Sequence, residues 1–236
     1  MARFRIAIIL ITAAISAALG AFDSDCTDSS DTCLEWAANG HCKISDWVAN
    51  NCRVSCKRCN GKLPRPYDVT RLPVELQPIG FLVGRWRSEF GGKAKFPTIP
   101  VFTYGEQLDF TISEQPVFGQ RSVNYTAFSW AVNQQDALHS EYGVLHVKSG
   151  TSHVSLTTVM NNGFTTVEEG SVFNNKIDLK LIEIGRISWS RDMPVLDLRR
   201  EWQLIDPHTL DQRLIMQTLT NQMQEHTYIR YKKIYP

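Results

Sequence analysis

The chain has 236 residues, and its 25 Lys and Arg against 24 Asp and Glu give a formal net charge of +1. This length suits one large domain, or a medium domain with a small one. A nucleic-acid-binding protein needs a basic field, and the balanced charge excludes that class of partner. The short basic pairs Arg199-Arg200 and Lys232-Lys233 are interpreted as solvated strand faces.

Residues 1–20 have the order of a secretory signal peptide. Arg3 and Arg5 precede an apolar run from Ile6 to Leu19, and small residues follow it. The alternative is a membrane anchor, but this run is shorter than the roughly 20 apolar residues that a spanning helix needs. We therefore expect cleavage near Gly20 or Ala21. The mature chain is then secreted into the extracellular space, without a stable membrane anchor, through an oxidising compartment.

All six cysteines lie between residues 26 and 59. A segment this short buries too little apolar surface to fold without covalent links, and an even cysteine count in a secreted chain predicts disulfides. The alternative is a zinc site at Cys56-x-x-Cys59, but this motif lacks a second pair of ligands. Residues 60–68 contain Gly61, Pro64 and Pro66 and are predicted to form a short linker.

The cysteine segment carries four motifs: Cys26-x-Asp28, Cys33-x-x-Trp36-Ala37, Gly40-x-Cys42 and Cys52-x-x-x-Cys56-x-x-Cys59. On these it resembles the ShKT domain, named for a potassium-channel toxin. The resemblance implies a module of two short helices over residues 26–59, with the disulfides Cys26–Cys59, Cys33–Cys52 and Cys42–Cys56. The toxins block the channel with a Lys-Tyr pair, but Trp47-Val48 stands at that place. We interpret the module as an extracellular interaction or stabilising unit.

Residues 69–236 show the alternation of antiparallel strands. Leu108, Phe110 and Ile112 alternate with polar residues, and so do Ile177 and Leu179. Turn signals such as Asn161-Asn162-Gly163, Asn174-Asn175 and Asp206-Pro207-His208 separate the runs. About ten strands are expected, and a closed barrel would remove their exposed edges. The fold class is therefore all-β: a ten-stranded antiparallel barrel, preceded by the small disulfide-rich module.

Motifs of the common enzyme classes do not occur in the barrel segment. There is no G-x-G-x-x-G, P-loop, H-E-x-x-H or G-x-S-x-G. Glu168 and Glu169 are adjacent, so they point to opposite faces of a strand and cannot share a substrate; we interpret them as a hairpin flank. Of the histidines, His208 and His153 are expected near turns. Since His139 and His146 are seven residues apart, at most one of them points inward.

Six segments of the barrel region occur in the order of a known family: GFLVGRWRSEF, FPTIPVFTYGEQLDF, LHSEYGVLHV, TTVEEGSV, GRISWSRD and MQTLTNQMQEHTYIRYKKI. On them the region resembles the nitrobindins, heme-binding ten-stranded barrels that include the barrel fused to some THAP zinc-finger proteins. The resemblance implies a heme b cofactor. Because every cysteine lies in the small module, an imidazole is the next available axial ligand.

The resemblance also assigns site residues. His226, at the head of the last strand, matches the axial iron ligand. Thr98 of Phe-Pro-Thr and His139 of Leu-His-Ser-Glu match residues near the other heme face. Gly84 and Trp86 match the start of the family's G-x-W-x-G-x-G motif. This chain departs from that motif by two extra residues, which displace the glycines to Gly91-Gly92.

The resemblance implies a secreted heme protein that binds nitric oxide and isomerises peroxynitrite, a reactive nitrogen species, to nitrate. Two alternatives stay open: a lipocalin-like or fatty-acid-binding-like carrier of an apolar ligand, and an inert scaffold that displays the ShKT module to a protein partner. The sequon Asn124-Tyr125-Thr126 marks a candidate glycosylation site at Asn124.

Overall fold

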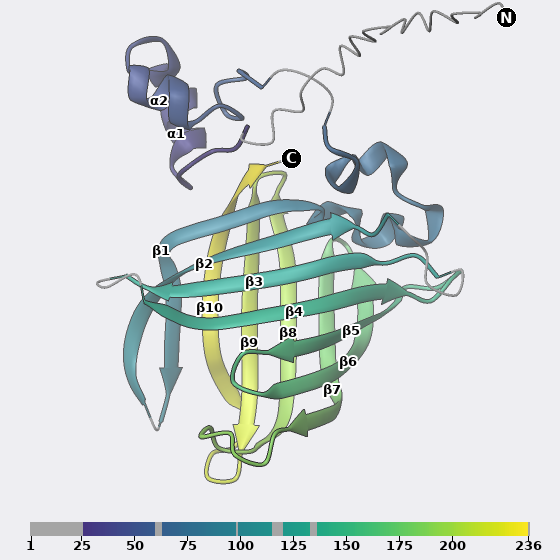
Figure 1. The fold of residues 1–236 in the computed structure, drawn as a ribbon. Coiled ribbons are helices and arrows are strands. Elements are labelled where there is room, and N and C mark those ends of the chain that lie inside the picture. Colours follow the sequence, from purple (N-terminus) through teal and green to yellow (C-terminus); the bar gives the residue numbers. More distant parts are fainter. Residues whose placement is uncertain (1–25, 60–62, 98, 115–119, 133–135, 236) are drawn as a thin grey trace, which may run out of the picture.

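The computed structural model describes residues 26–59, 63–97, 99–114, 120–132 and 136–235. The predicted signal peptide and Thr98 therefore lie outside the described residues. Within those residues, the chain forms a small helical module, a short helical segment and a β-barrel (Figure 1). No helix in the described part of the chain is long and apolar enough to cross a membrane.

The small module contains α1 (Cys33–Ala38), the 3-10 turn η1 (His41–Lys43) and α2 (Asp46–Asn51). Disulfides join Cys26 to Cys59, Cys33 to Cys52 and Cys42 to Cys56, which are the three pairs that the ShKT resemblance implies. Helix α2 begins after Ser45, whose side chain accepts a hydrogen bond from the backbone N–H of Val48. The buried centre is small, so the disulfides carry much of the stability.

Three 3-10 segments precede the barrel: η2 (Arg65–Tyr67), η3 (Val69–Arg71) and η4 (Val74–Leu82). The alternation of strands was expected from about Val69, but the first strand begins only at Gly84. In η4, Leu76, Ile79 and Leu82 are fully buried and belong to the barrel core. The η segments therefore cover one end of the barrel, which we call the cap end.

Ten strands form a closed antiparallel barrel in which each strand pairs with its sequence neighbours and β1 closes against β10. This confirms the predicted fold class. The strands are β1 (Gly84–Phe96), β2 (Ile99–Ile112), β3 (Val123–Ala131), β4 (Ala137–Val147), β5 (His153–Met160), β6 (Phe164–Phe173), β7 (Lys176–Arg186), β8 (Val195–Asp206), β9 (Thr209–Thr218) and β10 (Gln224–Tyr235). We call the end opposite the cap, where β1 meets β2 and β9 meets β10, the mouth; it faces downward in Figure 1.

The barrel interior changes in character along its axis. Near the cap, it is filled by apolar and aromatic side chains that include Trp86, Leu108 and Phe110. Nearer the mouth, it buries the charged residues Glu141 and Arg200. The interpretation of both basic pairs as solvated faces is thus wrong for one member of each pair. Arg200 is 1% exposed, and Lys233 lies 5.0 Å from the Trp86 ring. Successive residues of a strand point to opposite faces, so one member of each pair enters the barrel.

The two extra residues of the glycine motif form a bulge in β1. Ser88 pairs with Glu106 and Gly92 with Tyr104, so three residues of β1 stand opposite the single residue Gly105. Phe90, in the bulge, is 68% exposed. A side chain at position 92 would lie within 2.8 Å of the Tyr104 ring, so glycine is required where β1 returns to register. The insertion is therefore accommodated outside the barrel wall.

Candidate functional site

His226 occupies a β-bulge at the mouth. Glu225 pairs with Ile215 and Thr227 with Leu214, so His226 is an extra residue without a partner in β9. A bulge turns a side chain away from the regular alternation of its strand, and bulges are common beside active sites. The direction of this imidazole is therefore set by the bulge and not by the regular pairing of Glu225 and Thr227 with β9.

The imidazole of His226 packs against an aromatic ring. It meets the Phe96 ring edge-on, with 5.3 Å between ring centroids. Its Nδ1 is the only buried side-chain nitrogen or oxygen atom of the described residues that has no hydrogen-bond partner. Burial lowers the pKa of His226, a backbone hydrogen bond of Lys95 raises it, and nearby His139 lowers it further; the net change is downward. A neutral imidazole with an unsatisfied nitrogen is a candidate metal ligand.

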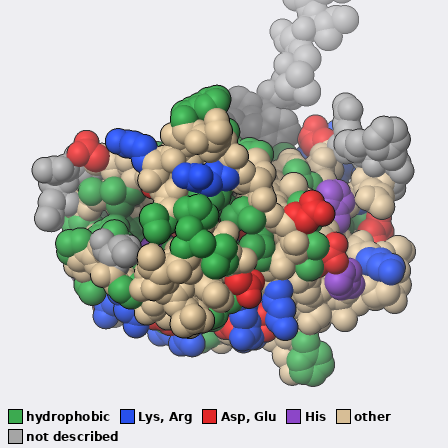
Figure 2. Space-filling view, turned by 90° about the horizontal axis from the view of Figure 1, so that it is seen from below, with side chains coloured by type: hydrophobic (Ala, Val, Ile, Leu, Met, Phe, Trp, Pro, Cys, Tyr) green, Lys and Arg blue, Asp and Glu red, His purple; other side chains and the backbone are tan. Residues whose placement is uncertain are grey.

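The mouth around His226 is apolar. Figure 2, which views the molecule from below, shows hydrophobic side chains gathered over this face. Exposed hydrophobic residues lie in the connections and strand ends at the mouth, and we call them the apolar rim: Ile99, Val101, Phe102, Leu138, Trp189, Met193, Leu219 and Met223. Contiguous patches of exposed apolar side chains often mark binding surfaces in soluble proteins. The rim is suited to the faces of a flat hydrophobic ligand.

His139 points into the barrel beside His226 and is tied to a buried charge network. Its Nε2 lies 3.2 Å from Oε1 of Glu141. Burial alone would lower the pKa of His139, but the hydrogen bond and charge of Glu141 outweigh it, so the pKa is raised. His146, from the opposite face of β4, makes no such contact; its pKa is lowered by burial. The expectation that only one of the pair faces inward agrees with this geometry.

Arg200 is the centre of the network. Its guanidinium bonds Glu141 and Glu168, with N–O distances of 3.0 Å to each carboxylate. Burial alone would raise the pKa of Glu141, but Arg200 and His139 outweigh it and lower the pKa to about 2. The network continues from Glu168 through the hydroxyl of Thr166 to that of Thr158. The barrel interior next to His139 therefore contains a network of buried, mutually paired charges.

A second buried acid, Glu106, lies next to this network. Its carboxylate accepts a hydrogen bond from the hydroxyl of Tyr231. Burial raises the pKa of Glu106 to about 7, because it outweighs the Tyr231 hydrogen bond and the attraction of His139 and Arg200. The charge of Glu141 adds to this increase. The mouth therefore has one carboxyl group that titrates near neutral pH and one that stays ionised.

The sequence-predicted residues divide into two groups. His226 and His139 meet at the mouth, whereas Gly84 and Trp86 lie at the cap end. Trp86 pairs with Lys233, seven positions beyond His226 in β10, a separation of roughly 20 Å along the strand. The Trp86 indole donates to the carbonyl of Leu82 at 2.7 Å, and Gly84 has φ +135°. This geometry does not support Gly84 and Trp86 as cofactor contacts; they join the cap to the barrel. Asn124 is exposed on β3.

Four ionisable residues of the site were missed from the sequence: Glu106, Glu141, Glu168 and Arg200. Glu168 was interpreted as a hairpin flank, but it is fully buried in the middle of β6. Glu169 does point the opposite way, to the exposed His153. A signal existed, because Glu141 stands two residues after His139 and therefore faces the same side of β4.

Comparisons with known proteins agree with this architecture. The family described as "THAP4-like, heme-binding beta-barrel domain" matches residues 75–233, and the ShK domain-like family matches residues 25–59. An uncharacterized protein of Caenorhabditis elegans is 43% identical over 98% of this chain and 80% of its own length.

Relatives with named activities match the barrel. The peroxynitrite isomerase THAP4 of Rattus norvegicus is 29% identical over 75% of this chain, which spans only 30% of the rat protein. A peroxynitrite isomerase of Arabidopsis thaliana is 30% identical over 63% of this chain and 82% of that protein. The crystal structure of Rv2717c from M. tuberculosis covers 69% of this chain and 98% of its own, with 28% identity and a TM-score of 0.59.

Proposed function

The chain belongs to the THAP4-like heme-binding β-barrel family, here with an ShK-like domain in front of the barrel, and we propose that it is a secreted heme b protein that binds nitric oxide and isomerises peroxynitrite to nitrate. His226 is the proposed axial ligand. The observation that carries this assignment is the buried, unpartnered Nδ1 of an imidazole that a bulge aims into an apolar mouth.

The residues at the mouth fit a heme. A bound heme would supply the iron centre at which nitrogen oxides bind and rearrange. His226, with its lowered pKa, presents a neutral ring without the need to lose a proton at neutral pH. The apolar rim supplies contact surface for a porphyrin and keeps water from its faces. Thr98, outside the described residues, stays a predicted contact.

His139 has a separate proposed role at the mouth. Its raised pKa favours a protonated ring, and Glu141 holds that ring in place. A cationic donor in this position would attract an anionic nitrogen oxide and donate a hydrogen bond to it. Arg200 keeps Glu141 ionised and oriented, so the proton stays on the imidazole.

The test is the visible spectrum of the purified chain, with and without added hemin. We expect a Soret band that is lost in His226→Ala and kept in His208→Ala, in which an exposed turn histidine at the cap end is removed. Stopped-flow measurement of peroxynitrite decay should then show acceleration by the heme-loaded chain. A band that survives in His226→Ala would refute the ligand assignment.

A second candidate function, the carrier of an apolar ligand, is favoured by the same apolar rim. Extraction of the purified chain distinguishes the two. A bound lipid without a Soret band, even after hemin addition, would support the carrier. If the purified chain contains no lipid and binds no heme, the barrel is instead a scaffold for the ShK-like module and its protein partner.

Two further proposals concern the extracellular setting. The three disulfides of the small module suit an oxidising compartment. The exposed Asn124 is the second residue of β3 and lies on its outward face, accessible to a glycosylating enzyme. Mass spectrometry of the secreted chain tests both, since it reports the cleaved N-terminus and any glycan on Asn124.

A further inference from the structure

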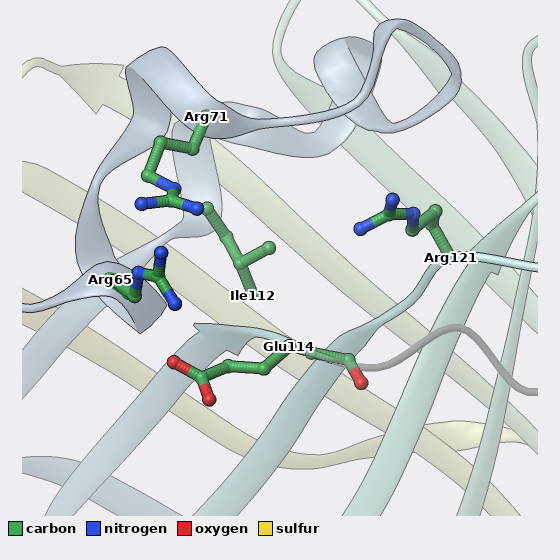
Figure 3. A pocket seen from close by; sticks show the side chains of 6 residues that line it. Arg65, Arg71, Ile112, Glu114 and Arg121 are labelled. Atoms are coloured by element: carbon green, nitrogen blue, oxygen red, sulfur yellow. The ribbon is translucent and has the colours of Figure 1, made fainter.

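A cavity at the cap end, far from His226, is surrounded by arginines (Figure 3). Its volume is about 80 Å³, and its lining residues are Arg65, Arg71, Ile112, Ser113, Glu114 and Arg121. Arg65 belongs to η2, Arg71 to η3, and Arg121 lies just before β3. In Figure 3 the guanidinium of Arg121 points across Ile112 toward the other two. Three cations from separate segments thus converge on one small space.

These arginines differ from most others in the barrel. Arginines 85, 87, 199, 200, 213 and 230 each form an ion pair with a carboxylate. Within the described part of the chain, Arg65, Arg71 and Arg121 form no ion pair. Among the lining residues that the structure describes, Glu114 is the only acidic one, so their formal charge is positive. Convergence of like charges is unfavourable unless an anion occupies the space between them.

The geometry specifies the class of anion. A guanidinium presents a planar fork of N–H donors that matches the oxygens of phosphate and sulfate. The cavity is much smaller than the roughly 300 Å³ or more of pockets for drug-sized ligands, so it suits a small ion or a single charged group. We propose that this cavity binds a tetrahedral oxyanion, either free inorganic phosphate or sulfate, or the same group at the end of a small ester.

Such an anion would also have a structural effect. Tyr67 of η2 already donates to Asp109 of β2 at 2.8 Å, and Arg85 of β1 bonds the same carboxylate. An oxyanion between Arg65, Arg71 and Arg121 would add a further link between the cap and the barrel. Ligand binding to the folded chain alone raises its stability in proportion to the logarithm of ligand concentration. This inference is independent of heme.

The experiment titrates inorganic phosphate, and separately sulfate, into the full secreted chain by calorimetry at constant ionic strength, with the melting temperature as a second readout. We expect saturable binding, weakened about tenfold or more in Arg71→Gln and in Arg121→Gln. Glu114→Gln should bind more tightly because it removes the competing negative charge. The matched control is Arg191→Gln, on the β7–β8 connection at the mouth, which should bind as the parent chain does.

Two results would overturn the proposal: absence of saturable binding, or an equal loss in Arg191→Gln, which would indicate diffuse surface charge. A competition experiment with glycerol phosphate distinguishes a free inorganic anion from a phosphate group carried by a small ester. Competition by the ester indicates an opening wide enough for a carried phosphate, whereas binding of the inorganic ions alone indicates a free ion. Equal affinity with and without hemin is expected, so failure here leaves the heme proposal untouched.

Discussion

Asp31 of the small module accepts a hydrogen bond, through Oδ2, from the backbone N–H of Glu89 in the β1 bulge, at 3.0 Å. A second link, 3.1 Å from the N–H of Asp28 to the carbonyl of Ile234, joins the module to the last strand. The ShK-like module is therefore attached to the barrel where the chain departs from the family's glycine motif. The inserted bulge has a partner within the same chain.

Removal of this partner should destabilise the bulge. In Asp31→Ala the N–H of Glu89 loses its acceptor, and we expect a loss of about 1 kcal/mol in the free energy of unfolding. Asp31→Asn retains a side-chain oxygen and should recover most of that loss. Urea unfolding of both variants measures the difference; equal stability of the alanine variant and the parent chain would show that the contact contributes nothing.

Arg200 should be far more important for stability than its neighbour. Arg200→Met leaves Glu168 buried without a counter-charge and Glu141 with His139 alone, which is expected to cost about 3–5 kcal/mol. Arg199→Met is the matched control, since Arg199 lies on the outer face and pairs with Asp178. Loss of that exposed pair should cost under about 1 kcal/mol. Chemical unfolding measures the free energy of unfolding of both variants. Similar losses in the two would contradict the proposal that the buried network around Arg200 stabilises the fold.

The strands were predictable from the sequence, whereas this charge network was not. Apolar side chains at alternate positions, such as Leu108 and Phe110, specify strands with a buried face, and the turn signals mark where they end. Charged residues are rarely buried, so a sequence reading places Arg200 and Glu168 in solvent by default. Only the closed barrel brings β4, β6 and β8 together around one guanidinium.

The site was predictable only in part, for a similar reason. His226 and His139 could be identified because their local motifs match the family. The bulge that aims His226 depends on its pairing with β9, which local sequence does not encode. The 3-10 cap escaped detection because Pro78 interrupts η4 and its apolar residues follow no regular helical period.

Glu106 should make stability depend on pH. Its pKa is raised from 4.5 to about 7 in the folded chain, so the folded state binds this proton more tightly than the unfolded state. The corresponding stability is fully present below about pH 4.5 and lost as pH rises through about 7. Relative to Glu106→Gln, the parent chain should therefore lose on the order of 3 kcal/mol across that range.

The comparison requires unfolding curves of both chains from pH 5 to pH 8. Glu183→Gln, at an exposed position of β7, is the control and should follow the parent profile. A constant difference between Glu106→Gln and the parent chain at every pH would refute the raised pKa.

Proton competition at His226 gives the last prediction. Its pKa lies below the ordinary value of 6.5, so the neutral form of the ring predominates at pH 6.5 in the heme-free chain. Hemin affinity should fall in acidic solution, where protons occupy the ligand nitrogen, with a midpoint below that of an ordinary histidine. Titration of hemin into the chain, followed by the Soret band at each pH, measures this profile.

The His139→Gln variant sharpens this test, because the charge of His139 is one cause of the lowered pKa at His226. Without that charge the pKa of His226 should rise, and the fall in hemin affinity should begin at a higher pH. The midpoint should stay fixed in His146→Gln, because His146 points out of the barrel from the same strand. A midpoint that stays fixed in His139→Gln, or that moves equally in both variants, would contradict electrostatic coupling between the two imidazoles at the mouth.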